Sequence, residues 1–356
     1  MSLARRLAAQ IAAGGPLTVA QYMTACLHDP QDGYYATRPG LGEDGDFITA
    51  PLVSQMFGEL IGLWAVETWT RMNRPPAVRL VEAGPGDGTL MCDALRAARL
   101  APDFLAAAEL WLVETSAPLR ERQRARLGEG PLTPRWAAAL AELPGGAPMI
   151  LVANELLDCL PARQFVRTDR GWAERVVGLS EDGALAFGLT GTPAGGLFPQ
   201  APAGAVLEVS AAQAALGAEL GRRVAADGGA ALLIDYGRAE PGFGDTLQAL
   251  RRHEKVDPLT APGKADLTVH ADFPAVLAAA GAQGAATAEI LTQADLLLRL
   301  GILDRAEALA RARPERRDEL ERQLLRLVSA DQMGQLFKAA CIHGPDFTPP
   351  GFDPHR

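Results

Sequence analysis

Short apolar runs alternate with longer amphipathic stretches through the middle of this chain. Four runs have the length and composition of buried strands, at residues 78–82, 110–114, 149–153 and 230–235. Apolar residues at helical spacing follow several of these runs, as at 90–99 and 118–127. Parallel strands need such crossover helices, which then cover both faces of the sheet. The pattern predicts an α/β fold built on a parallel sheet.

The flanking regions follow other patterns. Residues 1–75 are mainly helical in pattern, but a polar, glycine-rich stretch at 32–51 interrupts them. Residues 161–202 hold three strand-like runs joined by Asp-Arg-Gly and Glu-Asp-Gly turns, which indicates antiparallel hairpins. Residues 294–327 form a charged helical stretch with a break at Pro314, and residues 336–342 are typical of a last strand.

We therefore expect three parts in the chain. A helical N-terminal cap at 1–75 carries a loop that covers a cleft, and a core at 76–160 and 203–345 contains the parallel sheet. An antiparallel β insertion at 161–202 interrupts this core. The insertion offers a surface to a partner, and a second copy of the chain, forming a homodimer, is one candidate.

Composition and charge narrow the functional classes. The formal charge of −9 argues against a nucleic-acid binder, which presents a basic stripe to phosphates. No apolar run approaches the roughly 20 residues that a membrane-spanning helix needs, so no membrane insertion is expected. The scattered cysteines form no closely spaced pair, which predicts a reducing, cytoplasmic compartment and neither a disulfide framework nor a metal site.

The segment 80–90 places an acid and three glycines between a predicted strand and a predicted helix. Gly84, Gly86 and Gly88 let the backbone approach a ligand closely, and the following helix directs free N–H groups toward it. A dinucleotide fingerprint requires the spacing G-x-G-x-x-G, whereas this segment has G-x-G-x-G. Glu82 suits the ammonium group of S-adenosylmethionine better than a diphosphate. The alternative is a glycine-rich turn without a ligand.

Two further strand ends carry polar groups. Glu114 ends the second strand, where a carboxylate accepts hydrogen bonds from ribose hydroxyls; the alternative is a solvated strand end. Asn154 and Glu155 end the third strand and are expected to face the ligand cleft, although Asn154 is also a suitable helix cap. These positions favour a class I methyltransferase with a Rossmann-like sheet, in which Glu114 and Asn154 join the glycine segment in binding S-adenosylmethionine.

With these segments assembled, the chain resembles the MidA-like family of S-adenosylmethionine-dependent methyltransferases over nearly its whole length. The matching pieces are HDPQDGYY at 28–35, GDFITAP at 45–51, FGE at 57–59, EAGPGDGTL at 82–90, VETS at 113–116, NELLDCLP at 154–161, DYG at 235–237, His253 with DPL at 257–259, ADLT at 265–268, TQ at 292–293 and MGQLFK at 333–338. Their order and number make the resemblance specific for the family.

The resemblance implies an activity and a partner. The mitochondrial member of the family is an arginine methyltransferase that assists the assembly of respiratory complex I. The resemblance therefore implies S-adenosylmethionine as the cofactor and a protein as the substrate. It also implies that the acceptor is an arginine in a subunit of complex I (NADH dehydrogenase).

An arginine acceptor requires carboxylates, because two oxygens can hold the planar guanidinium and accept its proton. Glu155 and Asp158, after the strand at 149–153, and Asp46, in the polar loop, are the expected catalytic residues. The residues expected to line the acceptor site are Tyr34, Tyr35, Thr49, Asp235 and Tyr236. The alternatives are that Asp46 and Thr49 only organise a turn, and that Gly237 only turns the chain.

Two other functions compete with this hypothesis. The first is a non-catalytic assembly factor that keeps the fold and binds a partner. The second is an NAD-linked oxidoreductase, which the glycine spacing and Glu82 disfavour. Binding of S-adenosylmethionine by the purified protein separates the methyltransferase from the non-catalytic assembly factor, and the oxidoreductase predicts binding of NADH.

Overall fold

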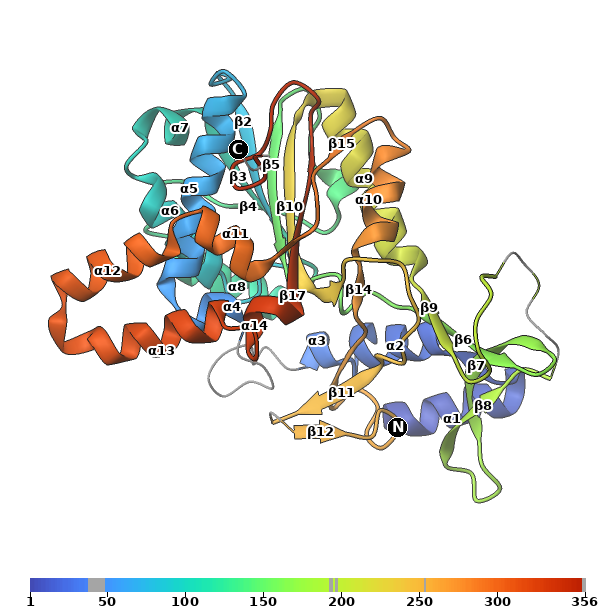
Figure 1. The fold of residues 1–356 in the computed structure, drawn as a ribbon. Helices are drawn as coiled ribbons and strands as arrows, with labels where there is room; N and C mark the ends of the chain where they lie inside the picture. Colours follow the sequence, from blue (N-terminus) through green and yellow to red (C-terminus); the bar gives the residue numbers. More distant parts are fainter. Residues whose placement is uncertain (38–48, 192–194, 196–197, 253, 354–356) are drawn as a thin grey trace. The chain divides into compact units, whose positions relative to one another are not determined.

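A computed structural model of the chain describes residues 1–37, 49–191, 195, 198–252 and 254–353. Its contacts divide the chain into two compact units, shown in Figure 1. The N-terminal unit comprises Met1–Phe47, Leu157–Ala214 and Glu240–Asp272. The sheet unit comprises Ile48–Leu156, Ala215–Ala239 and Phe273–Arg356. Asp46 lies outside the described residues.

The sheet unit is built on a sheet with the strand order β15-β17-β10-β5-β2-β3-β4, and β16 also pairs with β17. The strands from β10 to β4 run parallel, whereas β17 is antiparallel to β10, β15 and β16. The bounds of these strands are β2 (Val78–Ala83), β3 (Ala108–Val113), β4 (Arg135–Ala137), β5 (Met149–Asn154), β10 (Gly229–Arg238), β15 (Ala286–Thr287), β16 (Leu291–Thr292) and β17 (Phe337–His343).

The order of the strands creates a switch point between β2 and β5. From β2 the chain moves outward to β3 and β4, and it then returns across β2 to β5 and continues to β10. The connections after β2 and β5 therefore leave in opposite directions. In sheets of this kind a crevice for ligands opens at the carboxyl ends of such a strand pair.

Helices cover the sheet, as the long apolar strands require. In Figure 1, α5 and α6 lie on one side of the strands β5 and β10, and α9 and α10 lie on the other. The helices of this unit are α4 (Ala50–Val53), α5 (Gln55–Arg71), α6 (Thr89–Ala98), α7 (Pro102–Ala107), α8 (Ala117–Leu127), most of α9 (Ala211–Asp227), α10 (Phe273–Gly281), α11 (Gln293–Arg299), α12 (Ile302–Ala312), α13 (Arg317–Val328) and α14 (Met333–Leu336), with short 3₁₀ turns at Leu140–Glu142 and Pro314–Arg316.

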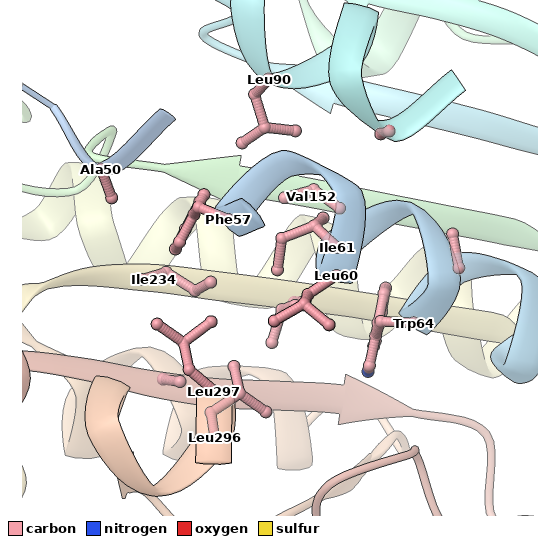
Figure 2. Close-up of a cluster of buried hydrophobic side chains, with 14 of the residues drawn as sticks. Ala50, Phe57, Leu60, Ile61, Trp64, Leu90, Val152, Ile234, Leu296 and Leu297 are labelled. Atoms are coloured by element: carbon pink, nitrogen blue, oxygen red, sulfur yellow. The ribbon is translucent and has the colours of Figure 1, made fainter. Parts of the chain in front are cut away.

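The core of the sheet unit forms where α5 packs on the strands. Figure 2 shows Phe57 and Ile61 of α5 directed toward Val152 of β5 and Ile234 of β10, with Leu297 of α11 approaching from another side. All five side chains are buried. Burial of each large aliphatic or aromatic side chain contributes roughly 1.5–3 kcal/mol to folding, so this contact is a major source of stability.

Glycines set the distance between paired helices on each side of the sheet. A Cβ on Gly62 of α5 would lie 2.3 Å from the carbonyl oxygen of Ala94 in α6. A Cβ on Gly217 of α9 would lie 2.3 Å from the carbonyl oxygen of Val276 in α10, and Gly221 faces α10 in the same way. Neither helix pair has room for a larger residue at these positions.

The N-terminal unit contains two antiparallel sheets. One has the order β1-β7-β6-β9, with β8 paired to β7, and the other has the order β12-β11-β13. The elements of this unit are α1 (Leu3–Gly14), β1 (Leu17–Thr18), α2 (Val19–His28), α3 (Tyr34–Thr37), β6 (Arg163–Thr168), β7 (Gly171–Leu179), β8 (Leu185–Leu189), β9 (Val206–Val209), β11 (Gln248–Arg251), β12 (Glu254–Val256), β13 (Asp266–Thr268) and β14 (Ala271–Asp272).

The predicted α/β fold and its parallel strands are confirmed, as are the antiparallel hairpins at 163–189. The three-part division of the chain stays a prediction. The hairpins form a sheet with β1, in a region where only helices were expected, and with β9. Residues 248–268, for which no strand was predicted, form the second small sheet. No helix among the described residues is long and apolar enough to cross a membrane.

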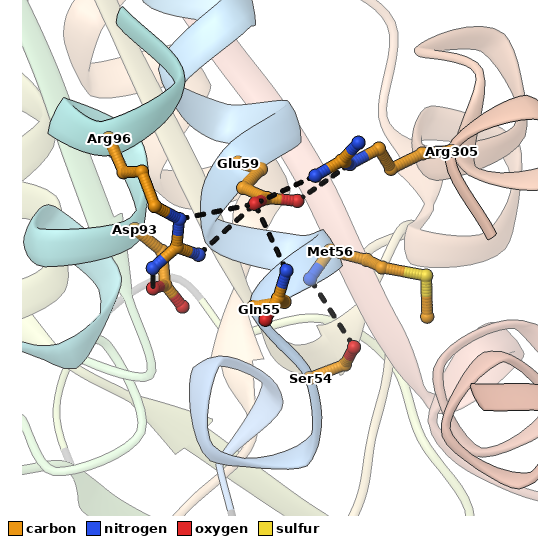
Figure 3. Close-up of polar contacts among 7 residues, drawn as sticks. All are labelled: Ser54, Gln55, Met56, Glu59, Asp93, Arg96 and Arg305. Carbon is orange, nitrogen blue, oxygen red and sulfur yellow. Dashed lines mark hydrogen bonds and ion pairs between the residues drawn. The ribbon is translucent and has the colours of Figure 1, made fainter. Parts of the chain in front are cut away.

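Glu59 joins three helices of the sheet unit through charge, as Figure 3 shows. Its buried carboxylate lies 3.1 Å from Nη2 of Arg96 in α6 and 2.8 Å from Nε of Arg305 in α12. Gln55, one turn earlier in α5, donates a further hydrogen bond of 3.2 Å. The carboxylate is therefore satisfied by two cations and an amide.

We expect Glu59→Ala to lower the free energy of unfolding by about 2 kcal/mol. Loss of one partner from a buried ion pair costs roughly 3–5 kcal/mol, but Arg96 and Arg305 are partly exposed and can turn to water. Urea denaturation measures the change. Glu307→Ala is the control, because it breaks an exposed pair with Arg311 that is worth under about 1 kcal/mol. Equal losses in both variants would contradict this account.

Candidate functional site

The polar strand ends predicted from the sequence lie along one edge of the sheet. Glu82 is the second-last residue of β2, Glu114 directly follows β3, and Asn154 ends β5. Because these strands are parallel neighbours, their carboxyl ends meet at the same edge. Glu82 and Asn154 flank the switch point, which is where a ligand binds in folds of this type.

The glycine segment forms a tight connection from β2 to α6. Gly84, Gly86 and Gly88 have φ angles of 69°, 53° and 86°, a region that residues with a side chain rarely adopt. Asp87 orients the start of α6, because its Oδ1 accepts a hydrogen bond of 3.0 Å from the backbone N–H of Thr89. The glycine segment therefore leads from Glu82, near the end of β2, directly to the N-terminus of α6.

Glu82 carries an unsatisfied oxygen in the interior. The side chain is 3% exposed, and its Oε2 has no hydrogen-bond partner among the described residues. Burial raises the pKa of Glu82 well above its ordinary value, and the charge of Asp87 adds to this effect. Oδ1 of Asn154 is likewise buried without a partner in the part of the chain that is described. Buried acceptors of this kind are costly, so they indicate a ligand that supplies donors.

Glu114 is held by hydrogen bonds from two directions. Its Oε1 accepts from the backbone N–H of Ser116 at 2.7 Å, and its Oε2 accepts from Nε2 of Gln123 at 3.3 Å. Burial nevertheless raises the pKa of this carboxyl above its ordinary value, because desolvation outweighs these bonds. The carboxylate is thus fixed in direction at the end of β3.

Sequence reasoning missed Gln123, although a signal was present. Leu119, Gln123 and Leu127 are spaced four residues apart, so they share one face of α8. All three are buried. A polar side chain within a buried apolar stripe is unusual and needs partners, which identifies Gln123 as a residue with a specific contact.

Glu155 lies in a strained backbone conformation directly after β5. Its φ angle is 55°, a left-handed value that costs a residue with a long side chain about 1–3 kcal/mol. Its Oε1 accepts hydrogen bonds from Nδ2 of Asn154 at 3.0 Å and from the backbone N–H of Ala50 at 3.2 Å. Strain of this kind occurs often at functional sites.

Three other predicted residues belong to the sheet unit. Thr49 directly precedes α4, and its carbonyl oxygen accepts hydrogen bonds within the first turn. Asp235 and Tyr236 follow Ile234, which pairs with Asn154 across β10 and β5. The structure therefore places Asp235 beside the end of β5, close in register to Glu155.

The remaining described candidates belong to the N-terminal unit. The rings of Tyr34 and Tyr35 lie edge to face at 5.3 Å, and the Tyr35 hydroxyl donates a hydrogen bond of 3.2 Å to Asp266. Burial raises the pKa of Tyr35 well above its ordinary value, and the charges of Asp266 and Asp158 add to it. Asp266 was not among the predicted site residues.

The sheet edge has the chemistry of a nucleoside-cofactor site. It offers a buried carboxyl oxygen of Glu82 that has no partner in the described part of the chain, a glycine segment for close approach, and a second carboxylate one strand away. The ammonium and ribose hydroxyls of S-adenosylmethionine are donors that match these acceptors. The described residues therefore fit the cofactor expected from the sequence.

Comparison with known proteins identifies the class of enzyme. Residues 60–291 match the family described as "Putative S-adenosyl-L-methionine-dependent methyltransferase". The chain is 34% identical to "Protein arginine methyltransferase NDUFAF7, mitochondrial" of Danio rerio, over 95% of this chain and 86% of that protein. It is 35% identical to the Drosophila melanogaster homolog of that name, over 95% of this chain and 84% of that one.

A solved structure supports the same class. A COG1565 superfamily member from Burkholderia thailandensis, bound to S-adenosyl-homocysteine, superposes with a TM-score of 0.82 at 27% identity. The alignment covers 99% of this chain and 92% of that one. The protein defined by this fold and site is a class I methyltransferase. The chain belongs to the family of S-adenosylmethionine-dependent methyltransferases, and this result argues against the NAD-linked oxidoreductase.

We expect Glu82→Gln to weaken binding of S-adenosylhomocysteine by about 10- to 100-fold, since a hydrogen bond to a charged group is worth roughly 1.5–3 kcal/mol. The raised pKa of Glu82 favours the protonated form in the cofactor-free protein, and an ammonium ligand favours the carboxylate. Binding should therefore release a proton, and affinity should rise with pH. Calorimetry in buffers of different ionisation enthalpy measures both quantities.

Glu109→Gln provides the control for this prediction, because Glu109 is exposed on the neighbouring strand. It should bind and release protons as the wild type does. Because the pKa of Glu82 is raised in the folded state, the cofactor-free wild type loses folding stability as pH rises through that pKa. The Glu82→Gln variant lacks this carboxyl and should therefore resist alkaline unfolding better. Wild-type affinity together with wild-type proton release in Glu82→Gln would refute the assignment.

Proposed function

We propose that this protein transfers a methyl group from S-adenosylmethionine to an arginine side chain of another protein. The observation that carries the proposal is the identity to proteins named as protein arginine methyltransferases, which reaches 38% over 76% of this chain in the Mus musculus relative. The carboxylates at the sheet edge support it, because a guanidinium acceptor requires anionic partners.

The cofactor roles follow from the donors and acceptors at the sheet edge. Glu82 binds the methionyl ammonium, Glu114 accepts hydrogen bonds from the ribose hydroxyls, and Asn154 contributes its Oδ1, which has no partner among the described residues. Gly84, Gly86 and Gly88 allow the backbone to pass close to the ligand. When bound, S-adenosylmethionine supplies the sulfonium methyl group.

Glu155 is the proposed catalytic carboxylate. Its strained backbone and its hydrogen bonds from Asn154 and Ala50 hold its side chain in one orientation at the end of β5. A carboxylate held in this way binds an arginine fork, orients one nitrogen and accepts the proton that methylation releases. We propose Asp46 and Asp158 as further catalytic carboxylates. The proposed acceptor-lining residues are Tyr34, Tyr35, Thr49, Asp235 and Tyr236.

The resemblance noted in the sequence extends the proposal to the acceptor protein, which we take to be a subunit of respiratory complex I. For the compartment, the cytoplasm remains our prediction, although the relatives are named as mitochondrial. Support for a reducing compartment comes from the four cysteines, all of which are free thiols. A homodimer through the hairpins at 163–189 also remains a prediction.

We expect Glu155→Gln to reduce methyl transfer by about 100-fold or more, because the amide can neither accept the proton nor bind a guanidinium through charge. Affinity for S-adenosylhomocysteine should stay within about threefold of the wild type, because the proposed contact of Glu155 is with the arginine acceptor and not with the cofactor. Mass spectrometry of arginine methylation on the acceptor measures turnover. The acceptor is found by comparing host proteomes with and without the protein.

Glu155→Gly is the matched variant for this test. Glycine adopts a φ of 55° without strain, so the variant should unfold at a higher temperature and still fail to transfer methyl groups. Wild-type turnover in either variant would remove Glu155 from the mechanism. A wild-type protein that binds the cofactor but methylates no arginine in the host proteome would favour the non-catalytic assembly factor.

A further inference from the structure

The side chain of Gln123 joins three parts of the sheet edge that carries the proposed cofactor site. This residue of α8 is fully buried. Its Nε2 donates a hydrogen bond of 2.8 Å to the carbonyl oxygen of Gly86 and one of 3.3 Å to Oε2 of Glu114. Its Oε1 accepts a hydrogen bond of 2.8 Å from Nε1 of Trp136.

The partners of Gln123 lie in or shortly after three neighbouring strands of the sheet. Gly86 lies in the loop after β2, Glu114 directly follows β3, and Trp136 lies in β4. An indole nitrogen can only donate, so Oε1 must face Trp136 and Nε2 must face the two acceptors. The amide therefore uses both of its donor hydrogens and its oxygen, and its orientation is fixed by chemistry.

Glutamine satisfies all three partners, which neither an apolar side chain nor an ionised glutamate does. Packing alone calls for an apolar side chain, as Leu119 and Leu127 on the same face of α8 show. Glutamate accepts from Trp136 but has no donor when ionised, and it would place a second carboxylate against Glu114. Burial already raises the pKa of Glu114, so a neighbouring negative charge would be strongly unfavourable.

We propose that Gln123 is a positioning residue of the cofactor site, which acts by holding the Glu114 carboxylate and the Gly86 carbonyl in the arrangement that receives the nucleoside. This inference rests on the proposed role of Glu114 in binding the ribose. In the proposed arrangement, Gln123 does not touch the cofactor. It fixes the positions of the Glu114 carboxylate and the Gly86 carbonyl, because a buried amide with three partners has one low-energy position.

The test measures the affinity of the protein for S-adenosylhomocysteine by calorimetry between pH 6 and pH 8. At pH 6 the two carboxyls of a Gln123→Glu variant can share a proton, which restores one of the two hydrogen bonds that the amide donated, the bond between positions 123 and 114. As pH rises the shared proton is lost, and the two carboxylates then repel each other. We expect affinity within about threefold of the wild type at pH 6 and about tenfold weaker at pH 8.

The other charged groups near this cluster do not produce such a profile. Arg120 donates to the carbonyl oxygen of Glu114, Arg124 covers the ring of Trp136 at 4.7 Å, and Arg126 pairs with Asp87 at 2.9 Å. Arginines keep their charge throughout this range. Glu82 titrates equally in every variant and favours binding at higher pH, so its effect has the opposite sign.

Two further variants complete the design. Gln293→Glu is the matched control, because Gln293 of α11 is equally buried and also donates to a backbone carbonyl, that of Leu327 at 2.9 Å. Its affinity relative to the wild type should not change with pH. Gln123→Met keeps the length of the side chain without its hydrogen bonds and should bind about tenfold more weakly at both pH values. It carries the test alone if Gln123→Glu does not fold.

The outcomes separate this inference from the proposed function. A Gln123→Glu profile parallel to that of Gln293→Glu, or wild-type affinity in Gln123→Met, would overturn the positioning role. Glu114→Ala is measured alongside. If Glu114→Ala loses affinity while the Gln123 variants bind normally, only the positioning role fails. If Glu114→Ala binds as the wild type does, the proposed ribose contact fails and the role of Gln123 fails with it.

Discussion

The buried side chain of Glu82, whose Oε2 has no hydrogen-bond partner among the described residues, is the constraint on which the proposed cofactor site depends. A carboxylate in the interior without a donor is unfavourable, and the chain retains it at the end of β2, beside the switch point of the sheet. A ligand that supplies donors, such as the ammonium of S-adenosylmethionine, would satisfy this oxygen. The unliganded protein therefore keeps a buried acceptor that a ligand with donors would satisfy.

The surrounding structure keeps that unfavourable group in place. Parallel strands bring Glu82, Glu114 and Asn154 to one edge, and the helices that flank the sheet are packed so closely that glycine is required where they touch. Glu59 adds charged contacts between α5, α6 and α12. Strain at Glu155 and desolvation at Glu82 are offset by this apolar and ionic packing, since a rigid scaffold can hold groups that are locally unfavourable.

Local patterns predicted much of the fold and part of the site. Apolar runs of strand length correctly located β2, β3, β5 and β10, because a strand buried on both faces must be apolar throughout. The glycine segment and Glu82 were visible for the same reason, as they are contiguous in the chain. Strand β1 was missed because its two residues pair with β7, far along the chain, and the sheet at 248–268 was missed because its strands are short and polar.

The sequence by itself determined the class of fold, the position of the glycine segment and the carboxylates that end the parallel strands, because each depends on neighbouring residues and on the periodicity of side chains. The tertiary structure alone decided that Oε2 of Glu82 has no partner among the residues that the structure describes, that Glu155 is strained, and that Gln123 joins the connections after β2 and β3 to β4. These properties arise from burial and from contacts between distant segments, and no local pattern in the chain encodes them.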